Sequence, residues 1–160
     1  MWYKHSHIVI SQSWDDYDDY DDYDEGDISQ ENSEQADNLA RAEDIYIYRG
    51  RELSDVVKDD SGKTIGALWT EWNYSFDEND EPVNKFTFDV VVDPAHRRKG
   101  IASDLVKQAI LEYENSANEM PGNSKIYAQV VRPEMKELLE KKFGWHVKNM
   151  QGNSWIMEPN

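Results

Sequence analysis

The 160-residue sequence contains no cysteine. This absence excludes disulfide bonds, a catalytic thiol and any metal site built from thiolates. It fits a reducing compartment, so we expect a cytoplasmic protein. The apolar run at residues 8–10 is also much too short for the apolar region of a secretory signal.

Long apolar stretches and basic residues are scarce as well. No run approaches the roughly 18 apolar residues of a membrane-spanning helix, so we expect no membrane contact. The chain has 17 Lys and Arg against 33 Asp and Glu, which gives a net charge of −16. Because sequence-independent nucleic-acid binding depends on basic side chains that neutralise phosphates, this balance disfavours direct nucleic-acid contact. It favours cationic partners through long-range attraction.

More than half of the net charge lies in one low-complexity segment, residues 15–27. Nine of its 13 residues are acidic, and Tyr17, Tyr20 and Tyr23 recur at every third position. Such a segment repels itself and has little to bury, so we predict an exposed loop. A calcium loop of the EF-hand type needs a Gly at its sixth position and a Glu at its twelfth, and no register supplies both. The sequence therefore predicts no metal site.

The rest of the chain alternates strand-like and helix-like patterns. We divide it into an amino-terminal region, residues 1–44, and a core, residues 45–160. In the first region a strand at 8–10 and an amphipathic helix at 33–43 are expected. In the core, strands are expected at 45–48, 55–58, 64–72, 86–92, 126–131, 145–147 and 154–157, and helices at 101–113 and 133–143. This order predicts an α/β (α+β) fold, a mixed sheet with helices on its faces.

Residues 90–102 carry the clearest chemical signal in the sequence. A β-prone strand leads into a turn with Arg97, Arg98 and Lys99, and Gly100 follows directly before the helix pattern. The first N–H groups of a helix lack internal partners and lie at the positive end of its dipole. Gly100 has no Cβ to keep a phosphate away from this backbone. The segment therefore predicts a phosphate-binding site.

The same segment, with Arg97, Gly100 and Ala102 in the run Val-x-Pro-x-x-Arg-x-x-Gly-x-Ala, resembles the acetyl-CoA-binding motif of the GNAT superfamily of N-acetyltransferases. Residues 126–130 are similar to the fifth strand of that family. Residues 138–145 are similar to its last helix and the Gly-aromatic pair that follows. The resemblance implies a GNAT fold: a central mixed, mostly antiparallel sheet, flanked by helices, in which strands four and five splay apart.

The resemblance also implies acetyl-CoA as co-substrate and direct transfer of its acetyl group to an amine in a ternary complex. The pantetheine arm would pair with the fourth strand, and the amides of the following turn and helix would hold the pyrophosphate. The expected cofactor-binding residues are Val90, Val91, Val92, Arg97, Arg98, Lys99, Gly100, Ile101, Ala102 and Ser103.

Two residues that transfer protons in many members of the family are missing. Leu139 stands where many members have a tyrosine that acts as general acid, and Gln129 stands where some have a glutamate. Neither side chain can exchange a proton. Asp89 on the fourth strand and Glu71 on the third are the carboxylates predicted to take this role, and Tyr127 is a candidate acid.

Two functions follow from these observations. The first is an acetyl-CoA-dependent N-acetyltransferase that acts on a cationic amine, either a polyamine-like small molecule or the Lys or N-terminal amine of a basic protein. The alternative is a catalytically weak binding module whose acidic segment occupies a basic protein partner as a nucleic-acid mimic. The intact phosphate motif favours the enzyme, since a mimic needs no Arg97 or Gly100. The sequence leaves open whether the protein is a monomer or a homodimer.

Overall fold

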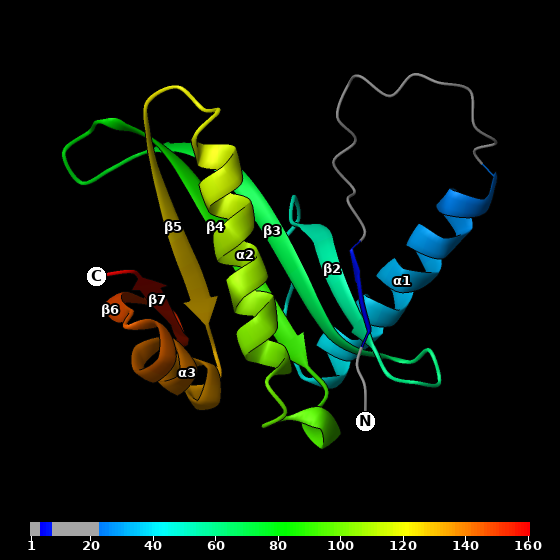
Figure 1. Ribbon diagram of the computed structural model, residues 1–160. Coiled ribbons are helices and arrows are strands. Elements are labelled where there is room, and N and C mark those ends of the chain that lie inside the picture. Colours follow the sequence, from blue (N-terminus) through cyan, green and yellow to red (C-terminus); the bar gives the residue numbers. More distant parts are fainter. Residues whose placement is uncertain (1–3, 8–22) are drawn as a thin grey trace.

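The computed structural model describes residues 4–7 and 23–160, with side chains from residue 30 onward. Seven strands form one sheet in the order β1-β2-β3-β4-β5-β7-β6 (Figure 1). Their bounds are β1 Lys4–His7, β2 Glu52–Lys58, β3 Thr64–Phe76, β4 Pro82–Val92, β5 Asn123–Val130, β6 His146–Gln151 and β7 Ser154–Glu158. The helices are α1 Tyr23–Ala42, α2 Ile101–Ala117 and α3 Pro133–Phe143, with a short 3-10 helix η1 at Pro94–His96.

All neighbouring strands in the sheet run antiparallel except β4 and β5, which are parallel. Their pairing begins at Val83 and Asn123 and ends at Phe88 and Ala128. Beyond that point β4 continues beside β3 alone, and β5 pairs with β7 on its other side. The two strands therefore diverge at their carboxyl ends (Figure 1). The mixed, mostly antiparallel sheet with splayed fourth and fifth strands is confirmed.

Helices cover both faces of this sheet, and successive strand residues explain why. Side chains alternate between the faces of a strand, so Val56 packs into one apolar cluster and Val57 into another. The first cluster includes Ala36 and Leu39 of α1, and the second includes Leu105 of α2 and Leu139 of α3. Complete burial of a Leu or Val side chain stabilises a fold by about 1.5–3 kcal/mol. These two clusters hold α1 on one face and α2 and α3 on the other.

The beginning of α2 lies unusually close to β3 at Gly66. A Cβ at this position would come within 2.9 Å of the Ile101 Cγ2 atom and 3.3 Å of the Leu105 Cδ1 atom. Contacts below about 3.0 Å force one of the two atoms to move, because the interior is already packed closely. Gly66 therefore allows α2 to start directly over the sheet, next to the end of β4.

The amino-terminal region differs from the sequence prediction. Helix α1 begins at Tyr23 and so includes residues 23–27 of the acidic segment, which we expected to be a loop. Residues 15–22, and the strand expected at 8–10, lie outside the described residues. A strand is present instead at Lys4–His7, paired with β2. None of the helices that the structure describes is both long and apolar enough to cross a membrane.

Residues 45–48 form a loop, although their alternation predicted a strand. The alternation itself is real: Ile45 and Ile47 pack against the cluster under α1, while Tyr46 and Tyr48 are exposed. The prediction was wrong because alternation reports which side of a segment is buried and not whether a neighbouring strand is free to pair with it.

We predict that Gly66→Ala lowers the free energy of unfolding by about 1–3 kcal/mol, because the added methyl group overpacks the contact between β3 and α2. Denaturant unfolding of the two proteins measures this loss. Ile101→Ala removes the atom that the methyl group meets, so Gly66→Ala should cost less in that background. An equal cost in both backgrounds would contradict the proposed contact.

Candidate functional site

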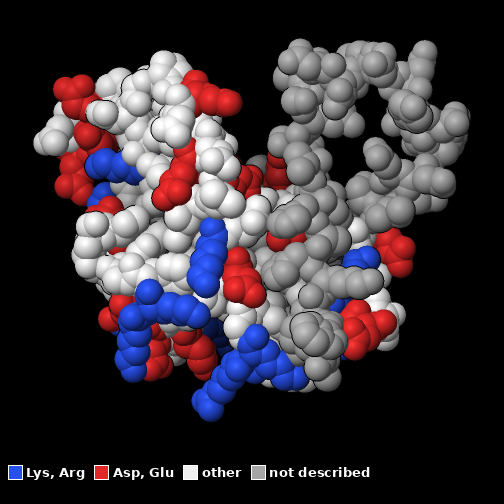
Figure 2. Space-filling view, viewed as in Figure 1, with Lys and Arg blue, Asp and Glu red and all other residues white. Residues whose placement is uncertain are grey.

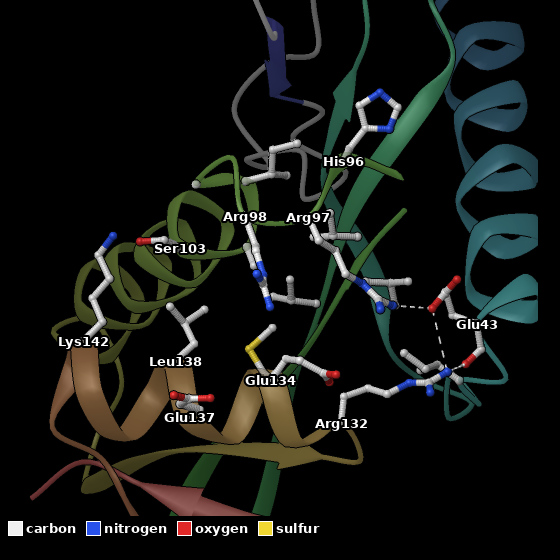
Figure 3. A pocket seen from close by; sticks show the side chains of 18 of the residues that line it. Glu43, His96, Arg97, Arg98, Ser103, Arg132, Glu134, Glu137, Leu138 and Lys142 are labelled. Carbon is white, nitrogen blue, oxygen red and sulfur yellow. Dashed lines mark hydrogen bonds and ion pairs between the residues drawn. The ribbon is translucent and has the colours of Figure 1, made fainter. Parts of the chain in front are cut away.

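A cavity of about 520 Å³ opens where β4 and β5 diverge. It lies between the end of β4, the beginning of α2 and one side of α3 (Figure 3). Of the ten predicted cofactor residues, all except Lys99 line it: Val90, Val91, Val92, Arg97, Arg98, Gly100, Ile101, Ala102 and Ser103. Met135 and Leu138 of α3 form an apolar wall that the sequence motif did not reveal.

The turn before α2 is built from local hydrogen bonds and unusual backbone angles. The Asp93 carboxylate accepts a hydrogen bond of 2.9 Å from the Ala95 N–H and so caps η1. This bond is the largest of the causes that lower the pKa of Asp93. Arg98 and Gly100 both have positive φ, at 62° and 81°. Because glycine adopts this region most readily, Gly100 is the residue that lets the chain turn into α2.

The beginning of α2 has polar groups that lack protein partners. Gly100 is its N-cap and offers no side chain to the first N–H groups of the helix. The Ser103 hydroxyl is buried, lines the cavity and has no hydrogen-bond partner among the described residues. An unsatisfied buried polar group costs about 1–3 kcal/mol. A bound anion that accepts hydrogen bonds from these groups would remove that cost, so this end of the cavity fits a phosphate ligand.

Basic side chains gather around this cavity in spite of the acidic composition. Figure 2 shows Lys and Arg concentrated on the lower part of this face, where α2 begins. Arg98 extends into the space between α2 and α3 (Figure 3). Arg97, in contrast, is bound to Glu43, with 2.5 Å between its Nη2 atom and the carboxylate. Arg132 lies 3.7 Å from the same carboxylate and also donates to the Glu43 backbone oxygen.

A second cavity of about 240 Å³ adjoins the first on the β5 side of the divergence. The two cavities share four lining residues, Ile45, Val90, Met135 and Arg132. The second is also lined by Asp44, Tyr46, Tyr48, Phe88, Asp89, Ala128, Gln129, Val130, Val131 and Ser154. The site thus has two adjoining cavities. The larger has phosphate-type donors, and the smaller has carboxylates and tyrosines.

The two predicted catalytic carboxylates meet at a residue that the sequence did not single out. Arg51 forms an ion pair with Asp89, and its Nε atom lies 3.6 Å from the Glu71 carboxylate. Its side chain is only 6% exposed. Burial lowers the pKa of Arg51, and the Glu71 carboxylate opposes this shift. Asp89 lines the second cavity and Glu71 does not, so the structure places only Asp89 at the cavity wall.

Arg51 also connects to two polar residues of the second cavity. Its Nη2 atom donates to the Gln129 side-chain oxygen at 3.4 Å, and Gln129 Nε2 donates to the Tyr48 hydroxyl oxygen at 3.1 Å. The centre of the Tyr48 ring lies 5.1 Å from the Arg51 guanidinium carbon. Tyr127, the candidate acid, lines neither cavity, and its hydroxyl accepts from Lys148.

Leu139 is fully buried in the core beneath α3. Among the described residues no three His, Asp or Glu side chains lie together as a metal-ion site would require. Sequence patterns did not reveal Glu43, Arg51 or Tyr48, because each belongs to the site only through partners distant along the chain.

Comparison with known proteins identifies one family. The model of the acetyltransferase (GNAT) family matches residues 11–145. A mutant AtaT toxin, solved with the carboxyl terminus of the antitoxin AtaR and acetyl-CoA, is 12% identical, with 98% of this chain and 92% of that chain covered and a TM-score of 0.57. An acetyltransferase from Trypanosoma brucei is 14% identical over 94% and 96% of the two chains, with a TM-score of 0.51.

Eis1 from Mycobacterium abscessus is 16% identical and covers 91% of this chain, with a TM-score of 0.59. The match spans only 31% of the Eis1 chain. Identities at this level show a shared fold alone. No curated protein matches the sequence significantly.

We predict that acetyl-CoA raises the melting temperature of the wild-type protein and that Gly100→Glu abolishes this rise. A ligand at a hundred times its dissociation constant stabilises by about 2.7 kcal/mol. Glutamate at position 100 would put a side chain and a negative charge beside the first N–H groups of α2. Thermal unfolding with and without acetyl-CoA is the measurement.

Gly62→Glu is the matched control for this variant. Gly62 also has a positive φ, of 86°, and an added Cβ would meet nothing within 4 Å at either glycine. Both variants should therefore lose similar stability without ligand, while only Gly62→Glu keeps the response to acetyl-CoA. Equal responses in the two variants would show that the phosphate lies elsewhere.

Proposed function

The chain belongs to the acetyltransferase (GNAT) family, and we propose that it transfers the acetyl group of acetyl-CoA directly to a cationic amine. The observation that carries this proposal is the pair of adjoining cavities at the divergence of β4 and β5. Direct transfer requires both substrates to be present together with their reacting atoms aligned. Such alignment alone lowers a barrier by several kcal/mol.

The larger cavity is the proposed acetyl-CoA site. Residues 90–92 pair with β3 on one side, and no strand of the described part of the chain pairs with them on the other. Their free backbone groups would bind the pantetheine amides as an added strand does. The N–H groups at the start of α2, the Ser103 hydroxyl and Arg98 would hold the pyrophosphate. Lys99 lies in the same turn and adds positive charge.

The smaller cavity is the proposed acceptor site. An alkylammonium has a pKa of about 10, so most of such a substrate carries a proton at neutral pH and cannot attack a carbonyl. A carboxylate in contact with the amine, directly or through water, can take this proton. We propose Asp89 for this role ahead of Glu71, because Asp89 lines this cavity.

The lining of the acceptor cavity supports a cationic substrate. Tyr46 and Tyr48 lie edge to face at 5.2 Å, and Asp44 and Asp89 contribute carboxylates. Aromatic rings and carboxylates both attract alkylammonium groups. A polyamine-like molecule and a Lys or N-terminal amine of a basic protein each meet this requirement, and the net charge of −16 would concentrate either of them. We place the reaction in the cytoplasm because the chain has no cysteine.

One observation favours the alternative, a catalytically weak binding module with a basic protein partner. Leu139 is fully buried, so α3 offers no tyrosine hydroxyl at the position where the family commonly has one. Residues 15–22 of the acidic segment lie outside the described part of the chain. Stabilisation by acetyl-CoA without thiol release from any amine would support this alternative over the enzyme.

We predict that the wild-type protein releases thiol from acetyl-CoA with at least one amine of a panel of polyamines, aminoglycosides and Lys peptides. Asp89→Asn should lower kcat by about 10²-fold, the usual contribution of one general base, and leave acetyl-CoA stabilisation intact. The assay follows thiol release at saturating acetyl-CoA.

Glu71→Gln is the control for this substitution, since it removes the same charge from the same partner, Arg51. Glu71 lies outside both cavities, so the Glu71→Gln variant should keep most of the activity. Equal losses of kcat in the two variants would show that the carboxylates act by fixing the position of Arg51. Full activity in both would assign proton removal to solvent.

A further inference from the structure

The proposed reaction needs a second proton-transfer group that the residues assigned so far do not supply. The leaving group of a thioester is a thiolate, and its departure is faster when an acid protonates the sulfur. Leu139 is an apolar core residue and Tyr127 lies outside both cavities. Tyr48, on the loop between α1 and β2, does line the proposed acceptor cavity.

On the basis of the proposed function, we propose that Tyr48 is the general acid of the reaction, with Gln129 and Arg51 as positioning residues. The direction of its hydrogen bond carries this inference. Gln129 Nε2 donates to the Tyr48 oxygen at 3.1 Å. A phenol oxygen that accepts one hydrogen bond still has its own O–H available as a donor. The Tyr48 proton is therefore not consumed by this contact.

Arg51 determines which way the Gln129 amide faces. The Arg51 guanidinium donates to the Gln129 side-chain oxygen at 3.4 Å, so the amide nitrogen must face the other way. That nitrogen reaches both Tyr48 and, at 3.3 Å, the Ser154 hydroxyl. A carboxylate at position 129 would instead accept the Tyr48 proton. Glutamine therefore suits a site in which Tyr48 must give its proton to something else.

The positive charge of Arg51 favours the state that follows the proton transfer, in which the Tyr48 oxygen is negative. Its guanidinium carbon lies 5.1 Å from the Tyr48 ring. When Tyr48 loses its proton, the negative charge on its oxygen lies near this cation and accepts the Gln129 hydrogen bond. Both contacts are stronger with a charged oxygen than with a neutral one. The network therefore stabilises the state that exists after the proton has moved.

The bonds and protons of the step balance. The amine nitrogen forms a bond to the thioester carbonyl carbon, and the carbon–sulfur bond breaks with its electron pair left on sulfur. The Tyr48 hydroxyl proton moves to that sulfur, which leaves as a thiol. The ammonium substrate loses two protons in total. The first passes to Asp89 or its water, and from there to solvent, before the attack. The second takes the same route once the nitrogen–carbon bond has formed, and solvent returns one proton to the Tyr48 oxygen, so that one proton is released in each turnover.

Other tyrosines of the described chain fit this role less well. Tyr46 lines the same cavity but is 73% exposed, against 45% for Tyr48, and the Arg51 network does not include it. The Tyr113 hydroxyl donates its proton to the Ser124 backbone oxygen. Tyr74 belongs to the exposed end of β3, in contact with Phe76.

The test is Tyr48→Phe, which keeps the ring and removes the hydroxyl alone. We expect kcat to fall by about 10²-fold with little change in the KM of the amine. Tyr74→Phe makes the same chemical change outside both cavities and should leave kcat unchanged.

Calorimetric binding provides a readout without turnover. At about pH 9, where a thiol is partly ionised, Tyr48→Phe should bind CoA about fivefold more weakly, as expected for one lost hydrogen bond. Its affinity for acetyl-CoA, which has no free sulfur, should not change. If Tyr48 had only a structural role, Tyr48→Phe would lower the affinity for both ligands equally.

The outcomes separate the two proposals. If the wild type transfers acetyl groups and Tyr48→Phe keeps its kcat, the role of Tyr48 is overturned and the proposed function stands. If the wild type binds acetyl-CoA but acetylates no amine, the proposed function fails, and equal CoA affinity of wild type and Tyr48→Phe then overturns the role of Tyr48 as well.

Discussion

The parting of β4 from β5 is the structural feature on which the whole site depends. Two parallel strands that stayed paired to their ends would satisfy each other's backbone groups and leave no room between them. Here the pairing ends at Phe88 and Ala128, and β7 takes the other edge of β5. The last residues of β4 are therefore open to a ligand that can replace a strand, and both cavities lie along this opening.

An opening in the middle of a sheet must be held at a defined width, and two ionic groups do this. Arg51 contacts Glu71 on β3, Asp89 on β4 and Gln129 on β5. Glu43 joins Arg97, which follows β4, to Arg132, which follows β5. Each group connects the two sides of the opening through the segment between α1 and β2.

The same segment contributes to both the proposed acceptor cavity and the proposed acetyl-CoA cavity. It supplies Glu43 to the wall of the larger cavity, and it supplies Tyr46 and Tyr48 to the wall of the smaller one. Ile45 and Ile47 anchor it against the apolar cluster beneath α1. The packing of α1 on the sheet thus positions the residues proposed to bind the amine and to protonate the leaving group, although none of them belongs to α1 itself.

Local sequence patterns were sufficient to predict the fold class, the basic turn before α2 and the helix that follows it. Strand and helix periods, and a turn of Arg97, Arg98 and Gly100, are local patterns that neighbouring residues make visible. The second cavity, in contrast, could be recognised only from the packed fold. Arg51 meets Gln129 across 78 residues of chain, and Tyr48 meets it across 81. No local pattern records such pairs, because they exist only once the loop after α1 has packed over the open end of the sheet.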